Sequence, residues 1–146
     1  MSGEFLGTYS SSINKKKWIT IPADFKRKFS TAAKQKVVIT IGPNKNIAIY
    51  PLDNWNKKME QLSRGDKKAV KLKFNLQNFA NLPQKLEVNG RVKISKRLLK
   101  FANITTKAMV KGEGNYISVW NPERFEAFTQ QIIEDHVKLF DSLDYQ

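Results

Sequence analysis

The sequence contains no cysteine and a single histidine among its 146 residues. Without thiols, disulfide bonds and thiolate metal sites are excluded, and the composition fits a reducing compartment. His136 stands beside Asp135 in an acidic C-terminal segment, with no second histidine and no nucleophile motif to complete a catalytic group. We therefore expect a surface histidine, no enzymatic activity, no metal and no cofactor.

Long apolar runs are also missing. None approaches the roughly 18 residues that a membrane span requires. Met1 is followed by Ser-Gly-Glu instead of a basic and then apolar leader. With 40 % hydrophobic and 11 % aromatic residues, the chain can bury one core, and chains of this size usually form one domain. We expect a single cytoplasmic domain and no membrane contact.

Acidic residues are scarce, since 13 Asp and Glu stand against 26 Lys and Arg, a formal net charge of +13. Residues 1–60 carry 11 basic and 4 acidic side chains, residues 61–112 carry 13 and 2, and residues 113–146 carry 2 and 7. Such an excess causes self-repulsion unless a polyanion or an acidic surface neutralises it. The composition favours nucleic-acid binding through the basic part and predicts that the acidic end stays away from phosphates.

Similar segments recur about 70 residues apart. The first copy comprises Ile13–Phe25, Val37–Gly42 and Ile47–Trp55, and the second comprises Glu87–Leu98, Ala108–Gly112 and Ile117–Phe125. Each copy is too small to fold alone, so two copies are expected to complete one core. Any function then belongs to a pseudo-symmetric surface on which both copies place cations.

Alternating and β-branched segments predict strands separated by turn-forming residues. The strongest hairpin motif is Asn89-Gly90, between Leu86–Val88 and Val92–Ile94. The other strands are expected at residues 5–10 and 18–21 and in two further hairpins, 37–41 with 47–50 and 108–112 with 116–120.

Helices are predicted where good N-terminal residues precede apolar positions at helical spacing. Pro22, Asp53, Asp66 and Asn121 would begin helices over 23–29, 53–62, within 66–81 and from 122 onward, and Leu98 marks one more short helix. Phe125, Phe128, Ile132 and Ile133 give the last helix an apolar face to bury. The predicted organisation is one domain of residues 1–146, with repeats over 5–55 and 84–126, a helical connection over 56–83, and a C-terminal helix and tail over 127–146.

Four motifs, in this order and spacing, resemble the MraZ family of bacterial transcription regulators. They are Phe5-Leu6-Gly7-Thr8-Tyr9, Ile21-Pro22-Ala23, Tyr50-Pro51 with Trp55, and the block from Gly114 to Phe125. The resemblance covers essentially the whole chain and implies two SpoVT/AbrB-type swapped-hairpin units. It implies an α+β, mainly β fold, in which two halves form a barrel-like core with short helices and a C-terminal helix.

The sequence departs from the family pattern of an acidic residue followed by glycine and arginine before an Ile-Pro step. The second copy keeps Glu87, Gly90 and Arg91, although Ser95 replaces the proline. In the first copy Asn14, Lys17 and Trp18 occupy the corresponding positions. The first turn remains basic, but its sequence preference for DNA is in doubt.

The resemblance implies sequence-specific binding of double-stranded promoter DNA near a cell-division and cell-wall gene cluster, at the nucleoid. Lysines would position the phosphate backbone, whereas Arg91 and Arg97 are candidates for contacts with base edges. The predicted DNA-binding residues are Lys15, Lys16, Lys17, Lys26, Arg27, Arg91, Lys93, Lys96 and Arg97. The resemblance further implies a ring-like homo-oligomer larger than a dimer. The negative charge of the tail predicts that it packs on the domain or contacts neighbouring subunits, not DNA.

Simpler interpretations stand beside these. Arg91 would equally form a structural ion pair with Glu87, and Lys15 to Lys17 would form an ordinary solvated turn. Trp18 and Trp120 are better explained as core or interface residues than as platforms for base stacking. The alternative function is a non-catalytic basic interaction protein or an RNA-binding module without sequence readout.

Overall fold

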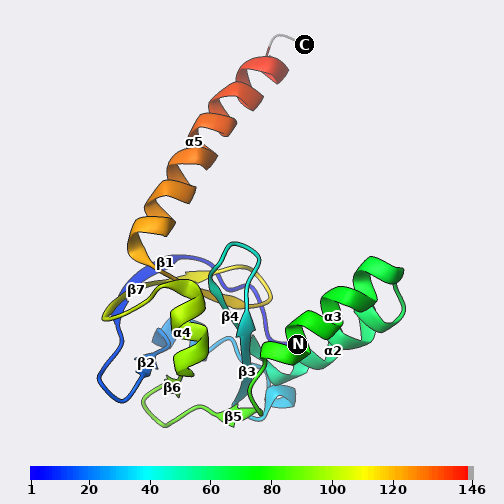
Figure 1. The fold of residues 1–146 in the computed structure, drawn as a ribbon, viewed down its shortest axis with the longest axis vertical. Helices are drawn as coiled ribbons and strands as arrows, with labels where there is room; N and C mark the ends of the chain where they lie inside the picture. Colours follow the sequence, from blue (N-terminus) through cyan, green and yellow to red (C-terminus); the bar gives the residue numbers. More distant parts are fainter. Residues whose placement is uncertain (145–146) are drawn as a thin grey trace.

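The computed structural model describes residues 1–144 and contains a six-stranded sheet, a two-stranded ribbon and peripheral helices (Figure 1). The strands are β1 (Thr8–Ser12), β2 (Trp18–Thr20), β3 (Lys36–Ile41), β4 (Ile47–Pro51), β5 (Gln84–Lys85), β6 (Arg91–Lys93), β7 (Lys107–Gly112) and β8 (Ile117–Trp120). The helices are α1 (Ala23–Lys26), the 3₁₀ turn η1 (Thr31–Ala33), α2 (Leu52–Ser63), α3 (Lys67–Phe79), α4 (Lys96–Ala102) and α5 (Pro122–Asp144). Tyr145 and Gln146, the end of the predicted tail, lie outside the described residues.

The two parts of the chain that flank α3 exchange strands. The sheet has the order β1-β7-β8-β4-β3-β5, and each neighbouring pair is antiparallel. β1 therefore pairs with β7 from the later part, and β5 pairs with β3 from the earlier part. β2 and β6 form the separate ribbon, with Ile19 opposite Val92. The β3–β4 and β7–β8 ladders form within one part, whereas the β1–β7, β3–β5, β4–β8 and β2–β6 ladders each need both parts. The complete sheet and the ribbon therefore require the whole chain.

Alternate residues of the central strands face two different environments. Ile47 and Ile49 of β4 join the main apolar cluster, as do Ile117 and Val119 of β8. The intervening residues lie on the other face, where Trp120 contacts the rings of α5. Both faces are buried, which explains why these strands are nearly continuous apolar runs.

Three of the predicted helix starts are confirmed by backbone or cap geometry. Asp66 accepts a hydrogen bond from the Ala69 backbone at 3.0 Å and begins α3. Asn121 accepts two backbone hydrogen bonds, from Glu123 at 2.8 Å and from Arg124 at 3.0 Å, and Pro122 is the first residue of α5. α1 follows Pro22, as predicted, but ends at Lys26.

The barrel prediction is wrong because the sheet is open. β1 and β5 form its two ends and each is paired on one side only. β5 has only two residues, and β2 and β6 pair with each other in place of extending the main sheet. Closure would require a continuous ladder that these short strands do not supply.

The hairpin predicted around Asn89-Gly90 is correct in its turn and wrong in its strand pairing. Gly90 has a positive φ of 84°, and its backbone donates to the Glu87 carbonyl at 2.7 Å. Beyond the turn the chain diverges, so that β5 pairs with β3 and β6 pairs with β2. The turn motif is local, whereas the partner of each strand is set by the rest of the fold.

The predicted helix cap at Asp53 is also wrong. α2 begins at Leu52 after Pro51, and the Asp53 carboxylate instead accepts hydrogen bonds from the Ser2 backbone at 2.8 Å and the Ser30 hydroxyl at 2.7 Å. Partial burial opposes ionisation of this carboxyl, but these hydrogen bonds outweigh it and hold the pKa of Asp53 below its usual value. Asp53 therefore ties the N-terminus to the body.

Gly112 lies where β7 passes the backbone of Phe5. A Cβ atom at this position would lie well inside van der Waals distance of the Phe5 backbone C and O atoms. We expect Gly112→Ala to lower the free energy of unfolding by about 1–3 kcal/mol, as overpacking does. Urea denaturation measures the effect. Gly3→Ala is the control, because its nearest neighbouring atom is 3.9 Å away, and equal stability of the two variants would contradict the packing argument.

Candidate nucleic-acid interface

The β2–β6 ribbon has one buried face and one outward face. Ile19 and Val92, which lie opposite each other, are buried in the main core. Trp18 lies opposite Lys93 and Thr20 opposite Arg91, so these four residues share the outward face. A two-stranded β-ribbon is narrow enough to enter the major groove of B-DNA. In Figure 1 the ribbon lies on the opposite side of the body from the α2–α3 hairpin.

Two turns with matching hydrogen bonds extend the ribbon at its ends. In the first turn, residues 14–17, Lys17 donates its backbone N–H to the Asn14 carbonyl at 2.9 Å and has a φ of 68°. In the second turn, residues 87–90, Gly90 makes the corresponding bond to Glu87. The Lys17 carbonyl accepts from the Ile94 backbone and the Gly90 carbonyl accepts from the Ile21 backbone, both at 2.9 Å. Each turn is thus hydrogen-bonded to the residue that follows the ribbon strand of the other part, the first turn after β6 and the second turn after β2.

The end of the ribbon beside the first turn carries cations only. The Ile94 bond and the Trp18–Lys93 pairing place the first turn beside residues 93–94. We call the lysines of these two neighbouring segments and of the adjoining start of α4 the lysine end: Lys15, Lys16, Lys17, Lys93 and Lys96. Within residues 1–144 none of their ammonium groups has a hydrogen-bond or ion-pair partner. Unneutralised positive charges at this end of the ribbon favour the binding of phosphates.

The end beside the second turn is largely neutralised, and we call it the paired end. Its members are Asp24, Lys26, Arg27, Glu87 and Arg91. Arg27 forms an ion pair with Asp24, and the Lys26 ammonium contacts the Val88 carbonyl. With three cations and two carboxylates, the paired end attracts phosphate more weakly than the lysine end.

Arg91 is held in place from two sides. Its Nη2 atom donates to a Glu87 carboxylate oxygen at 2.7 Å. Its guanidinium carbon lies 4.9 Å from the centre of the Trp18 ring. The ion pair considered for Arg91 is therefore present, and Nη1 remains without a partner in the described part of the chain. Trp18, half-buried on the outward face, packs against this arginine.

Arg97 lies away from the ribbon's outward face. It donates to the Asn78 carbonyl at 3.1 Å, and its guanidinium carbon is 4.8 Å from the centre of the Phe79 ring. These contacts attach α4 to the end of α3. Sequence reasoning did not identify them, since nothing in the spacing of Arg97 and Phe79 indicates contact across the fold.

A small apolar slot elsewhere does not resemble an anion site. It has a volume of about 190 Å³ and is lined in part by Tyr50 and Tyr116, whose stacked rings are 4.9 Å apart. Burial raises the pKa of Tyr50 to about 12, and the pKa of Tyr116 is raised mainly by burial and secondarily by Glu113.

Residues 1–144 contain no group of three His, Cys, Asp or Glu side chains placed to hold a metal ion. No helix among them is long and apolar enough to cross a membrane.

The chain is thus an α+β protein whose two interleaved parts form a basic β-ribbon between two turns with matching hydrogen bonds. Comparison with known proteins identifies its family. A family model described as "MraZ protein, putative antitoxin-like" matches residues 5–75 and 83–140. The chain belongs to the MraZ family.

Relatives from several bacteria are similar over most of their length. A protein of Thiobacillus denitrificans is 28 % identical over 88 % of both chains. One from Methylobacillus flagellatus is 28 % identical over 96 % of this chain and 97 % of its own. One from Thermomicrobium roseum is 29 % identical over 84 % of this chain and 85 % of its own. All three are named Transcriptional regulator MraZ.

The contact between Trp18 and Arg91 is expected to stabilise the ribbon measurably. A double-mutant cycle with Trp18→Leu and Arg91→Gln should give a coupling free energy of about 0.5–1 kcal/mol, the range for a partly exposed cation–π pair. Urea denaturation of the wild type, the two single variants and the double variant measures it. A coupling free energy of zero would show that the two side chains are neighbours without energetic interaction.

Proposed function

We propose that this protein is a sequence-specific DNA-binding transcriptional regulator, which acts at the nucleoid in the cytoplasm. The lysine end is the observation that carries the proposal, since its five cations lack any carboxylate partner among residues 1–144. The names of the curated relatives support a role in transcription. We place the target in a cell-division and cell-wall gene promoter, which is what the family resemblance implies.

The two ends of the ribbon are proposed to have different roles. Lys15, Lys16, Lys17, Lys93 and Lys96 would neutralise phosphates and release their counterions. Lys26 and Arg27 would add a weaker contact, because both side chains are already engaged. Arg91 would contact a guanine edge through Nη1, with Glu87 and Trp18 holding it outward. Arg97 would act indirectly, by fixing α4.

We further propose that residues 5–55 and 84–126 are repeats of the swapped-hairpin type, joined by the helical connection and followed by the C-terminal helix. The strand exchange between β1 and β7 and between β5 and β3 supports this assignment. A homo-oligomer larger than a dimer, arranged as a ring, would present several lysine ends to repeated promoter sites. Linked sites raise affinity through effective concentration.

Removing a lysine from the lysine end should weaken binding to all DNA sequences. Lys16→Ala is expected to reduce the slope of log K against log salt by about 0.9, the loss of one phosphate contact. Fluorescence anisotropy at several salt concentrations measures it, with a promoter duplex, a scrambled duplex and a structured RNA. Lys57→Ala, which removes the same charge from α2, is the control. If all three nucleic acids bind equally, the protein is a generic polyanion binder.

Arg91→Ala should instead affect sequence preference. We expect a cost of about 1–3 kcal/mol on the cognate duplex and a relaxed preference at one base position. Competition binding with single-base variants of the duplex measures both effects. If the variant binds as the wild type does but unfolds at lower urea, the arginine is only a structural partner of Glu87.

A further inference from the structure

The C-terminal helix α5 leaves the body with most of its apolar face uncovered. Only its start is packed, where the Trp120 ring lies 5.5 Å from Phe125 and 4.9 Å from Phe128. Its remaining length projects into solvent (Figure 1). The exposed apolar residues lie on one side of the helix, at helical spacing: Ile132, Ile133, Val137, Leu139, Phe140 and Leu143. The predicted burial of Ile132 and Ile133 is therefore wrong within a single chain. An apolar stripe of this length is typical of an interaction surface.

α2, the helix of the earlier part that corresponds to α5, is covered by a neighbouring helix. α2 follows β4 as α5 follows β8, and β4 and β8 are the paired central strands. Along α2, Met59 is buried, and Lys73 of α3 donates to the Ser63 hydroxyl at 2.7 Å. α3 thus packs beside α2, while in the described chain α5 contacts a helix only at its start, where Arg124 donates to the Phe101 carbonyl of α4 at 3.4 Å. Along the projecting part of α5, the position that corresponds to that of α3 beside α2 holds no helix of the described chain.

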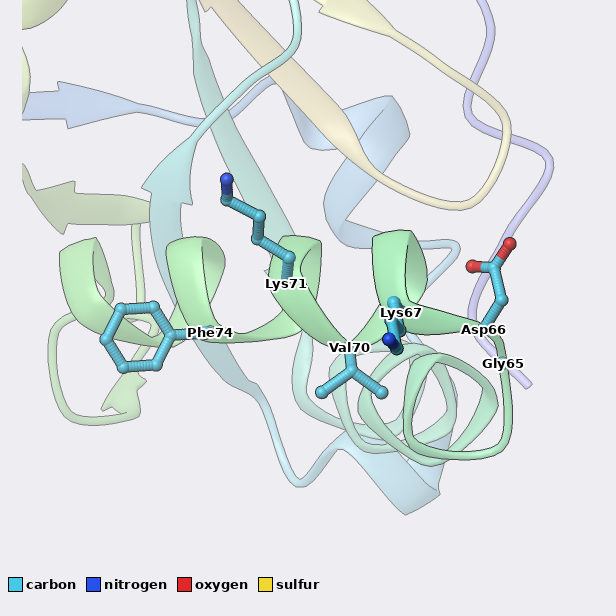
Figure 2. A pocket seen from close by; sticks show the side chains of 6 residues that line it. All are labelled: Gly65, Asp66, Lys67, Val70, Lys71 and Phe74. Atoms are coloured by element: carbon cyan, nitrogen blue, oxygen red, sulfur yellow. The ribbon is translucent and has the colours of Figure 1, made fainter.

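The outer face of α3 is itself uncovered. Val70 and Phe74 are 49 % and 68 % exposed, on a helix whose charged residues are all lysines. They line an open hollow of about 610 Å³ together with Lys67, Lys71 and Asp66, whose carboxylate caps the start of α3 (Figure 2). The hollow is too open to enclose a small molecule, but its shape and chemistry suit an apolar helix with acidic borders.

The charges of the two helices are complementary. α3 carries four lysines and no acidic residue, whereas α5 carries six carboxylates against one arginine and one lysine. On the helix surface Asp135 and Asp141 border the apolar stripe of α5. Two α5 helices side by side would bring these like charges together, whereas α5 on α3 pairs them with Lys67 and Lys71. The two helices project from different sides of the body, so the pairing requires two chains.

We infer that α5 of one copy docks on the outer face of α3 in a second copy. Such an interface joins different surfaces of the two chains, so it generates a closed ring or an open chain of subunits. The inference rests on the proposed homo-oligomer and specifies the surfaces that build it. It also leaves the lysine end free, because neither helix belongs to the β-ribbon.

Complementation between two variants tests the inference without DNA. Phe74→Asp places a charge on the outer face of α3, and Phe140→Asp places one on the apolar stripe of α5. Each variant alone should be monomeric, because the dissociation constant of the interface rises about 30-fold or more. Mixed in equal amounts, they should form a species of two chains and no more, because one intact α3 meets one intact α5. Sedimentation velocity measures the masses, and Ala127→Asp, which adds the same charge on the polar side of α5, should assemble as the wild type does.

Other outcomes overturn the docking. If Phe74→Asp assembles normally while Phe140→Asp does not, α5 pairs with itself; a monomeric wild type at micromolar concentration removes the interface altogether. Charge reversal gives a second test through exposed polar residues, since Lys71→Glu and Asp141→Lys should each weaken assembly and, combined in one chain, restore it. Absence of restoration contradicts the pairing. Binding of a single-site DNA duplex by the monomeric variants separates failure here from failure of the proposed function.

Discussion

The exchange of strands between the two parts of the chain is the constraint on which the rest of the structure depends. Because β1 pairs with β7 and β5 with β3, neither part has a complete sheet alone. The same exchange brings β2 and β6 together, and only then do Ile19 and Val92 seal one face of the ribbon while Lys93 and Trp18 face outward. The cationic surface is therefore a product of tertiary folding, not of one basic segment.

The ribbon is symmetric in its backbone and asymmetric in its charge. The two turns make the same hydrogen bonds, yet one carries lysines without partners and the other carries Glu87, whose carboxylate binds Arg91. The family motif is better preserved at the turn that is neutralised. In the proposed function, phosphate attraction by the lysines of the first turn does not require the acid, glycine and arginine that this turn lacks.

Local features were predictable from sequence because their causes are local. The Asp66 and Asn121 caps, the turn at Gly90 and the nearly continuous apolar central strands follow from side-chain chemistry and spacing. The hairpins of β3 with β4 and of β7 with β8 also followed, because a short turn joins each pair. The partners of β1, β2, β5 and β6, the open sheet and the contacts of Trp18 and Arg97 did not follow, since they join residues distant in sequence. Asp53 was misassigned because the Ser2 backbone and the Ser30 hydroxyl compete for its carboxylate, and one sequence does not reveal such competition. The sequence named the individual lysines and arginines of the predicted DNA-binding set. Only the structure shows which of these side chains have a hydrogen-bond or ion-pair partner.

Hydrogen exchange with and without a single-site promoter duplex tests the central claim most directly, because it locates the contact surface without any substitution. Exchange should become slower at residues 14–17 and 93–96, with weaker protection around residues 87–90 and none on the α2–α3 hairpin. Phosphate contacts and the hydrogen bonds that anchor the first turn to Ile94 would both slow exchange there. Protection centred on α3 or α5, with the ribbon unchanged at saturating DNA, would show that the ribbon is not the DNA-binding surface.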